Sequence, residues 1–384
     1  MAYGRKLFIS NDLSLGRDVM KIKIIFSAVL LMCSMSSFAC DEYIRSLPYT
    51  ITEGGKEYCV QRHGNGTLSF DPSTAPLLHY TIWSGTSHDG NSIMAYVRPA
   101  INIQANDITL RFLSKVQNTN PQKIYDEIDV GIFSGGGFGV DNIDIIDAKL
   151  KDFSVGTYIV GVDEVKISNA MLQKMHFTGI SIELAKNVTI LDSRVEALST
   201  DMSYPNANLF AINVGLEASG EASLRDVTVD RFFNTSTSAY ADNVGIRVRG
   251  GADADVELVD PFINSISGSE SLGVDSRAIE VMCFSGCTAN IIDGYLGEKY
   301  VIASGNPAIS LFGRFNSFEV VDVKFRYWSK ALYVQDHPDT LGYFADNEAL
   351  VYKKNGNSYY PSYDQVFDVS EGTVDGGNNR VSQR

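Results

Sequence analysis

Short runs in which apolar and polar residues alternate recur along most of this chain. The clearest copy is residues 187–195, NVTILDSRV, in which Val188 and Ile190 alternate with polar or mixed residues, Asp192 follows, and Val195 comes three positions later. Alternation with a period of two predicts a strand with one buried face. The aspartate predicts a bend, because its short side chain can hydrogen-bond to nearby backbone and tolerates an unusual φ.

The same template fits seven stretches of the chain. The residues after the strands, here called the bend positions, are Asp147, Asn169, Asp192, Asp226, Asp260, Asp293 and Asp322. The inward pairs before the bends are Ile143/Ile145, Val165/Ile167, Val188/Ile190, Ala222/Leu224, Val256/Leu258, Ala289/Ile291 and Phe318/Val320. The apolar residues three positions after the bends are Leu150, Leu172, Val195, Val229, Ile263, Leu296 and Phe325. This spacing identifies a repeat protein.

Each copy has a second half that keeps the same register. It opens with a small residue, namely Gly156, Gly179, Ala211, Gly245, Ala278, Ala308 or Ala331. The apolar pairs that follow are Thr157/Ile159, Ile180/Ile182, Ile212/Val214, Ile246/Val248, Ile279/Val281, Ile309/Leu311 and Leu332/Val334. One repeat is therefore strand, bend, short strand, variable loop, strand and short return. Such a unit, with a period of roughly 22 to 35 residues, predicts coils that stack with parallel strand pairing.

The runs NVTILD at 187–192 and GISI at 179–182 resemble repeats of the right-handed parallel β-helix, pectate-lyase-like superfamily. The resemblance covers about residues 100–335 and is specific for the fold, whereas many non-enzymes share the pattern. It implies an all-β, right-handed parallel β-helix solenoid with N- and C-terminal caps. We expect the N-terminal cap at 40–99, the coils at 100–336, and the C-terminal cap and tail at 337–384.

An export signal precedes the repeats. Residues 20–23 form a basic segment, residues 24–32 are apolar, and Ser-Phe-Ala at 37–39 offers small residues at a signal-peptidase site. The apolar run is too short to span a membrane. We expect the true start at Met20, cleavage of residues 1–39, and a periplasmic or secreted mature chain that begins at Cys40. A lipoprotein is the alternative, but Ser stands where a lipobox has Leu, so we expect no acylation.

The chain is acidic, with a formal net charge of −14. Residues 1–39 carry five basic and two acidic side chains, so their removal would leave a mature charge of −17. Nucleic acid is an unsuitable partner, because binding it requires Lys and Arg to neutralise phosphates. Polyanionic polysaccharides would also be repelled unless a local basic patch or a bridging Ca²⁺ intervened. We expect a monomer with no transmembrane segment in the mature chain.

The mature chain has four cysteines, and an even count in an oxidising compartment predicts disulfides. We expect Cys40–Cys59 in the N-terminal cap and Cys283–Cys287 closing a tight turn. Zinc is the alternative, but no Cys or His pair stands at ligand spacing around them.

Six of the seven bend positions are aspartates, and stacked carboxylates repel one another. We therefore expect them to face solvent in a structural role. A Ca²⁺-binding column is the alternative, although the Gly-Gly-x-Gly-x-Asp repeat of calcium β-rolls is matched only loosely by GGADAD at 250–255.

The longest insertions fall at one place in consecutive coils, between the post-bend apolar residue and the small residue. Early coils have five or six residues there, whereas 196–210, 230–244 and 264–277 have about fifteen each. Insertions at the same position in successive coils project from one face of the stack, where they form the walls of a cleft. The predicted walls include Asp201, Tyr204, Asp230, Arg231, Tyr240, Asp242, Glu270, Asp275, Arg277, Lys299 and Tyr300. The predicted floor is the outward column Ser181, Asn213, Arg247, Glu280, Ser310 and Tyr333.

Carboxylates, guanidinium groups and tyrosine rings are the groups that recognise sugars. We therefore predict a polysaccharide-binding groove, with Asn213, Tyr204, Tyr240, Tyr300 and Tyr333 as substrate-binding residues. Solvated loop residues, with Arg247 and Glu280 merely paired across adjacent coils, are the alternative. Lys166, outward on the other strands, is predicted to lie far from this groove.

The candidate catalytic residues are Arg247, Asp242, Asp275, Glu280 and Arg277. The resemblance implies either a polysaccharide lyase, with an arginine base and Asp-bound Ca²⁺, or a glycoside hydrolase with a carboxylate pair. The Asn-Thr-Asp, Asp-Asp and Gly-His-Gly motifs of polygalacturonases are absent from the sequence, and Asp-His-Pro-Asp at 336–339 has the epimerase letters in the wrong order. A non-catalytic surface, adhesin-like or structural β-helix module is the rival prediction.

Overall fold

The computed structural model describes residues 40–64, 66–82, 93–121, 127–135, 140–196, 209–233, 242–267, 275–298, 307–328, 330–335, 340–351, 362–369 and 373–383. The chain divides into a first unit, Met1–Cys40, and a second unit, Asp41–Arg384, to which the fold below belongs. The expected signal peptide lies outside the described residues. Within those residues, no helix has the length and apolar character needed to cross a membrane.

The second unit is all-β, and its described strands have two to eighteen residues. The first strands are β1 (Glu42–Ile44), β2 (Tyr49–Ile51), β3 (Lys56–Val60), β4 (Leu68–Phe70), β5 (Leu78–Ile82), β6 (Ile93–Ile103), β7 (Ile108–Phe112), β8 (Val116–Asn118) and β9 (Glu127–Gly135). Next come β10 (Asn142–Ile146), β11 (Lys149–Lys151), β12 (Val155–Val160), β13 (Glu164–Ser168), β14 (Met171–Gln173), β15 (Thr178–Leu191), β16 (Arg194–Glu196), β17 (Leu209–Arg225) and β18 (Thr228–Phe233).

The chain continues with β19 (Asp242–Ala252), β20 (Asp255–Val259), β21 (Phe262–Ser267), β22 (Asp275–Ile292), β23 (Tyr295–Glu298), β24 (Pro307–Val321), β25 (Lys324–Arg326) and β26 (Lys330–Val334). The last strands are β27 (Leu341–Ala345), β28 (Glu348–Val351), β29 (Phe367–Asp368), β30 (Thr373–Asp375) and β31 (Arg380–Gln383). Two short helices complete the described elements, the 3-10 helix η1 (Pro72–Thr74) and α2 (Tyr363–Val366).

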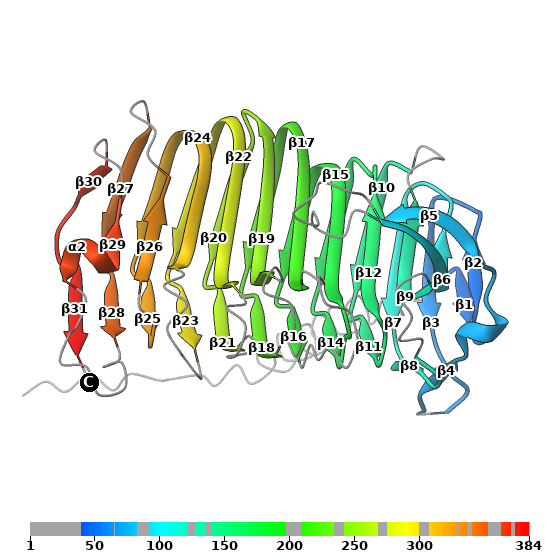
Figure 1. The fold of residues 1–384 in the computed structure, drawn as a ribbon. Helices are drawn as coiled ribbons and strands as arrows, with labels where there is room; N and C mark the ends of the chain where they lie inside the picture. The colour runs from blue at the N-terminus through cyan, green and yellow to red at the C-terminus, as the bar shows by residue number, and fades with distance from the viewer. Residues whose placement is uncertain are drawn as a thin grey trace, which may run out of the picture. The chain divides into compact units, whose positions relative to one another are not determined.

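The strands stack in three rows of parallel pairs (Figure 1). The pre-bend row runs β1, β3, β7, β10, β13, β15, β17, β20, β22, β24, β27 and β30. The post-bend row runs β4, β8, β11, β14, β16, β18, β21, β23, β25, β28 and β31. The third row runs β2, β6, β9, β12, β15, β17, β19, β22, β24, β26 and β29.

Four long strands explain why the pre-bend and third rows belong to one 20-stranded sheet. The first halves of β15, β17, β22 and β24 pair in the third row, and their second halves pair in the pre-bend row. The described exception to parallel pairing is the antiparallel pair β5–β6. This arrangement of mostly parallel strands in stacked rows is compatible with the coils predicted from the sequence.

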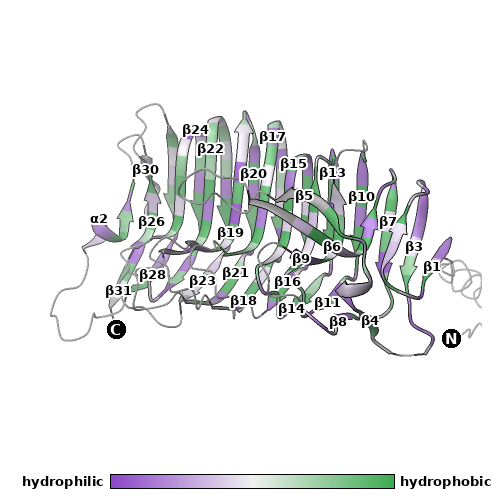
Figure 2. Ribbon diagram, turned by 45° about the vertical axis from the view of Figure 1, so that its right-hand side comes forward, coloured by the Kyte–Doolittle hydropathy of each residue, from purple (hydrophilic) through white to green (hydrophobic). Residues whose placement is uncertain are grey.

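The predicted register is confirmed. Val165 pairs with Val188, which pairs with Ala222, and each inward residue of this pre-bend column is at most 2% exposed. Ile180 and Ile212 are paired and buried in the same way in the third row. Apolar and polar residues alternate along the strands accordingly (Figure 2). Burial of each aliphatic side chain contributes about 1.5–3 kcal/mol, so the core formed by these columns is the main source of stability.

The bend positions adopt the unusual backbone conformation that the sequence predicted. All seven have a positive φ, between 48° and 58°, and Asp346 adds an eighth bend of the same kind at 57°. The backbone N–H of Asp192 donates to the carbonyl of Arg225 in the next coil at 3.1 Å, and equivalent bonds recur at other bends. Asp192, Asp226 and the later bend aspartates are exposed, as expected.

Parallel pairing extends beyond the predicted coil region, 100–336, at both ends. Strands β1 to β4 precede residue 100 and pair into the three rows, and β27 to β31 follow residue 336 and do the same. The interval 100–336 is therefore a minimum extent of the paired strands.

Candidate functional site

The predicted floor residues form one continuous column on the outer side of the third row. Ser181, Asn213, Arg247, Glu280, Ser310 and Tyr333 are successive register partners on β15, β17, β19, β22, β24 and β26. The side chains before Tyr333 point away from the core, yet each of these residues is at most 5% exposed. We call the outer side of these strands the loop-bearing face, because the long insertions precede β17, β19, β22 and β24.

Three of the candidate catalytic residues meet on this face. The Glu280 carboxylate accepts a hydrogen bond from Arg247 Nε at 2.6 Å and another from Arg277 Nη1 at 2.8 Å. The Arg247 guanidinium carbon lies 4.3 Å from the centre of the Phe210 ring, and that of Arg277 lies 5.7 Å from the centre of the Phe312 ring. A carboxylate on one side and an aromatic ring on the other therefore hold each guanidinium in place.

A second ionic group lies beside the first and involves residues that the sequence did not single out. The Glu183 carboxylate accepts hydrogen bonds from Asn213 Nδ2 and Arg249 Nη2, both at 2.6 Å. Burial raises the pKa of Glu183, while Arg249 and the Asn213 hydrogen bond act in the opposite direction. The sequence does contain a signal for this group. A second outward column lies two positions after the predicted floor, and in it Glu183 and Arg249 are separated by one glycine.

The glycine between them makes the second ionic group possible. Gly215 lies on the coil between Glu183 and Arg249, and a Cβ at this position would lie 2.3 Å from Glu183 Oε2. Any other side chain would therefore occupy the path by which Arg249 reaches across one coil to the carboxylate.

The pairing on the loop-bearing face limits its chemistry. Both oxygens of Glu280 accept from arginines, and Arg247 is 5% exposed, so neither group is presented as a free acid or base. The alternative that Arg247 and Glu280 pair across adjacent coils describes their geometry. Asp242 and Asp275 are register partners on β19 and β22, but their side chains lie outside the described residues.

Some of the other predicted site residues contact neighbouring side chains, and the rest lie outside the described residues. Tyr333 packs edge-on against Phe312, with 5.8 Å between ring centres, and Lys330 lies 5.1 Å from its ring centre. Asp230 accepts from Arg194 at 3.0 Å and from Asn264 at 3.1 Å, and the exposed Arg231 lies near it. The predicted residues outside the described part of the chain are Asp201, Tyr204, Tyr240, Glu270, Lys299 and Tyr300.

The structure contains an open groove of about 760 Å³ on a different face, the outer side of the pre-bend row. Its lining is Gly55, Lys56, Glu57, Asp107, Ile108, Thr109, Asn142, Asp144, Glu164, Val165, Lys166, Asn187 and Thr189. These residues come from or adjoin β3, β7, β10, β13 and β15. We call this feature the pre-bend groove. Lys166, which the sequence placed far from the predicted site, is part of it.

Two polar rows cross the floor of the pre-bend groove. One consists of the register partners Thr109, Asp144, Lys166 and Thr189 on four adjacent strands. The other consists of Asn142, Glu164 and Asn187, two positions earlier on the same strands. Neighbouring strands are about 4.8 Å apart, so the groove repeats hydroxyl, amide and charged groups at that spacing.

Asp144 is the most unusual residue of the pre-bend groove. Its Oδ1 atom is buried and has no hydrogen-bond partner among the described residues. Burial raises its pKa, Lys166 and Arg111 lower it, and Glu57 raises it further. The carboxylate of Glu57 is itself engaged, since it accepts from Arg111 Nε at 2.6 Å. Because Oδ1 is sealed from solvent, the groove presents only the partly exposed remainder of the Asp144 side chain.

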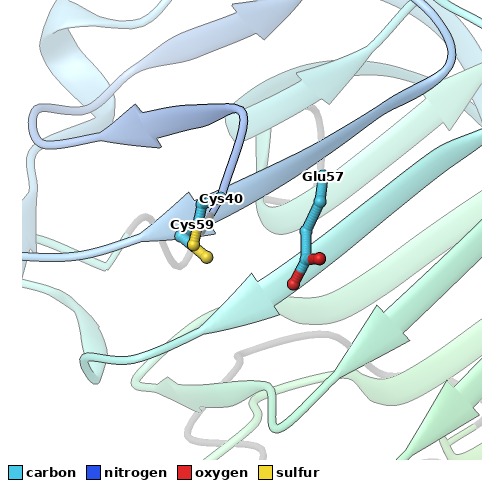
Figure 3. A group of neighbouring side chains, drawn as sticks. All are labelled: Cys40, Glu57 and Cys59. Carbon is cyan, nitrogen blue, oxygen red and sulfur yellow. The ribbon is translucent and has the colours of Figure 1, made fainter. Parts of the chain in front are cut away.

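The cysteines form disulfides, as predicted. Cys283 and Cys287 are bonded, with 5.8 Å between their Cα atoms, and Cys40 and Cys59 are disulfide-bonded as well. The sulfurs of Cys40 and Cys59 and a carboxylate oxygen of Glu57 lie within 4.8 Å of one another (Figure 3). These distances would suit a metal ion, but a cysteine binds metal as a thiolate, and both of these sulfurs are in disulfide bonds.

No family model, no curated protein and no solved structure matches this chain.

Proposed function

We propose that this chain is an exported right-handed parallel β-helix protein, similar to the pectate-lyase-like superfamily, that binds a polysaccharide in the pre-bend groove. The observation that carries the proposal is the open groove of about 760 Å³, whose lining includes the partly exposed Asp144 and two rows of polar register partners. A concave site of this size with a few convergent polar groups is typical of ligand recognition.

The lining suits a sugar chain better than other ligand classes. Sugar hydroxyls both donate and accept hydrogen bonds, and the groove offers hydroxyls, amides, carboxylates and ammonium groups together. The two polar rows repeat their groups on successive strands, which favours an extended ligand with a repeating unit. Nucleic acid is disfavoured by the net charge of −14.

The fold and the cysteines support export and a coil architecture. Two disulfides are typical of proteins from oxidising compartments, which agrees with the predicted signal peptide and a periplasmic or secreted location. Three rows of parallel strands with one bend column are the arrangement expected of a β-helix. We also propose that the mature chain is a monomer.

The loop-bearing face is a second candidate site. Three arginines and two glutamates gather on it, at the coils that carry the long insertions. A polysaccharide lyase or glycoside hydrolase centred on Arg247, Arg277 and Glu280 would have to break these ion pairs before acting, so binding without catalysis is favoured. A non-catalytic adhesin-like or structural module is the outcome if no glycan binds.

A glycan array with the mature chain, residues 40–384, tests the proposal. We expect Asp144→Ala combined with Lys166→Ala to weaken binding at least tenfold, which corresponds to about 1.4 kcal/mol. The matched control is Asn290→Ala combined with Glu319→Ala, another pair of register partners on the pre-bend row outside the groove lining. The control should bind like the wild type, and a product assay with and without Ca²⁺ then decides whether the bound glycan is cleaved.

The proposal fails if the wild type binds no glycan, or if the groove variant binds as tightly as the control. Thermal melting of both variants shows whether a loss of binding reflects unfolding. A variant of Arg247 or Arg277 that stays folded in thermal melting but loses binding, while the groove variant keeps it, would move the site to the loop-bearing face.

A further inference from the structure

We infer that the pre-bend groove selects glycans without acidic groups and binds those with free amino groups most tightly. This inference rests on the proposed function and concerns the ligand class of the same groove. It follows from the charges of the lining and from the place of Asp144 within it.

The groove lining is acidic. Four carboxylate residues, Glu57, Asp107, Asp144 and Glu164, face two lysines, Lys56 and Lys166. Two of these six groups are paired with residues outside the lining, Lys56 with Glu53 and Glu57 with Arg111, so three carboxylates remain against one lysine. The chain as a whole adds to the effect, because its formal charge is −14. An anionic chain is therefore repelled both in the groove and on its approach.

The Asp144 carboxylate can accept from a ligand donor. Its Oδ1 is sealed from solvent, but Asp144 is partly exposed and lines the groove, so a ligand hydroxyl or ammonium group can donate to the part of the carboxylate that faces the groove. A carboxylate cannot donate. An acidic ligand group that paired with Lys166 would lie one strand spacing, about 4.8 Å, from Asp144, so like charges would oppose the contact.

An ammonium group on the ligand makes a favourable contact with Asp144, whereas a ligand carboxylate is repelled. It donates to Asp144 and forms a charge-assisted hydrogen bond, which is stronger than a neutral one. The neighbouring Glu164 lies on the adjacent strand and lines the same groove, so a second amino group along a chain also meets a carboxylate. A neutral glycan makes the hydroxyl contacts alone. The expected order of affinity is amino, then neutral, then acidic glycan.

The described charged side chains of the loop-bearing face are paired with one another. Arg247 and Arg277 contact Glu280, and Arg249 contacts Glu183. An acidic chain that bound at this face instead would not respond to substitutions in the pre-bend groove, so a single set of ligands can report on both surfaces.

Isothermal titration calorimetry with three matched hexasaccharides tests the inference. The probes are β-1,4-linked hexamers of glucosamine, glucose and glucuronic acid, which differ only at the C2 and C6 positions, together with the α-1,4-linked counterparts. We expect the glucosamine hexamer to bind at least tenfold more tightly than the glucuronic acid hexamer of the same linkage, with the glucose hexamer between them. Its affinity should fall as salt is raised, because the contact is ionic.

Two substitutions locate the selectivity. Asp144→Asn should reduce the preference for the glucosamine hexamer severalfold, and Lys166→Gln should weaken the glucuronic acid hexamer further while sparing the glucosamine hexamer. Arg225→Gln, an exposed position outside the groove lining, is the control and should leave all affinities unchanged.

The possible outcomes separate the two proposals. If no hexamer of either linkage binds at millimolar concentration, polysaccharide binding itself is contradicted. If the glucuronic acid hexamer binds as tightly as the others, and Asp144→Asn does not alter the order, only the ligand class is overturned. If the acidic hexamer binds best, and an Arg247→Ala variant that is folded by circular dichroism no longer binds it, the loop-bearing face is the site.

Discussion

Replacing both Arg247 and Arg277 with alanine should destabilise the protein strongly. From the sequence, both are outward positions of a repeat, and surface substitutions usually shift stability by only about half a kcal/mol. In the structure they are the two donors to Glu280, which is 2% exposed. The double substitution would leave the carboxylate buried without either arginine.

The magnitude follows from the contacts that are lost. Each hydrogen bond to a charged group contributes about 1.5–3 kcal/mol, so two of them give about 3–6 kcal/mol. Removing one partner of a buried ion pair costs about 3–5 kcal/mol, which is the same range. The stacking of Arg247 on Phe210 adds about 0.5–2 kcal/mol. We expect the free energy of unfolding to fall by about 3–5 kcal/mol, since water that enters the vacated space recovers part of the loss.

Urea unfolding at pH 7, followed by circular dichroism and by fluorescence, measures the effect. The control is Arg225→Ala, which removes an exposed ion pair with Glu257 at 2.5 Å and should cost at most about 1 kcal/mol. A triple variant, Arg247→Met with Arg277→Leu and Glu280→Leu, replaces the whole group with apolar side chains. It should recover most of the lost stability, because a buried ionic group can often be exchanged for apolar residues.

Two results would refute this reasoning. One is a double variant that is no less stable than Arg225→Ala, which would mean that water solvates Glu280 despite its burial. The other is a triple variant that is no more stable than the double variant, which would mean that the loss comes from packing and not from the unpaired charge.

Three further outcomes are expected. Val248→Asp, at an inward position, should prevent folding because an unpaired buried charge costs several kcal/mol, whereas the outward Thr189→Asp should melt within a few degrees of wild type in a thermal scan. Burial raises the pKa of Glu183 above its usual 4.5, so wild-type stability should decrease as the pH rises from 4.5 through that raised value. In this range the midpoint of urea unfolding should vary less with pH for Glu183→Gln than for the wild type. At Asp226, where φ is 53°, substitution by Ala should cost about 1 kcal/mol in urea unfolding and substitution by Asn much less, and equal costs would contradict the role of the bend.

The candidate site was only partly predictable. The floor column from Ser181 to Tyr333 followed from counting positions after each small residue, and the register pairs agree with that count. The pairing of Asn213 with Glu183, and the reach of Arg249 across Gly215, did not follow. These contacts join residues up to 66 positions apart, and sequence alternation carries no information about which outward groups meet.

The pre-bend groove was missed for a related reason. Its coils have short loops, so the argument from long insertions pointed elsewhere, although Thr109, Asp144, Lys166 and Thr189 all stood at outward positions. Neither the hollow above them nor the unpartnered Asp144 oxygen has a signature in the local pattern.

The sequence alone determined which side of each strand faces the core, where each coil bends, and how Val188, Ile190 and their counterparts stack. These features depend on period-two geometry and on the local φ preference of aspartate, which act within a few residues. Only the tertiary structure decided which outward side chains are buried, which ones pair, and which face is open. Those properties depend on what neighbouring coils bring beside each residue, so Arg247 is held between Glu280 and Phe210, while Lys166, in an equally outward position, lines an open groove.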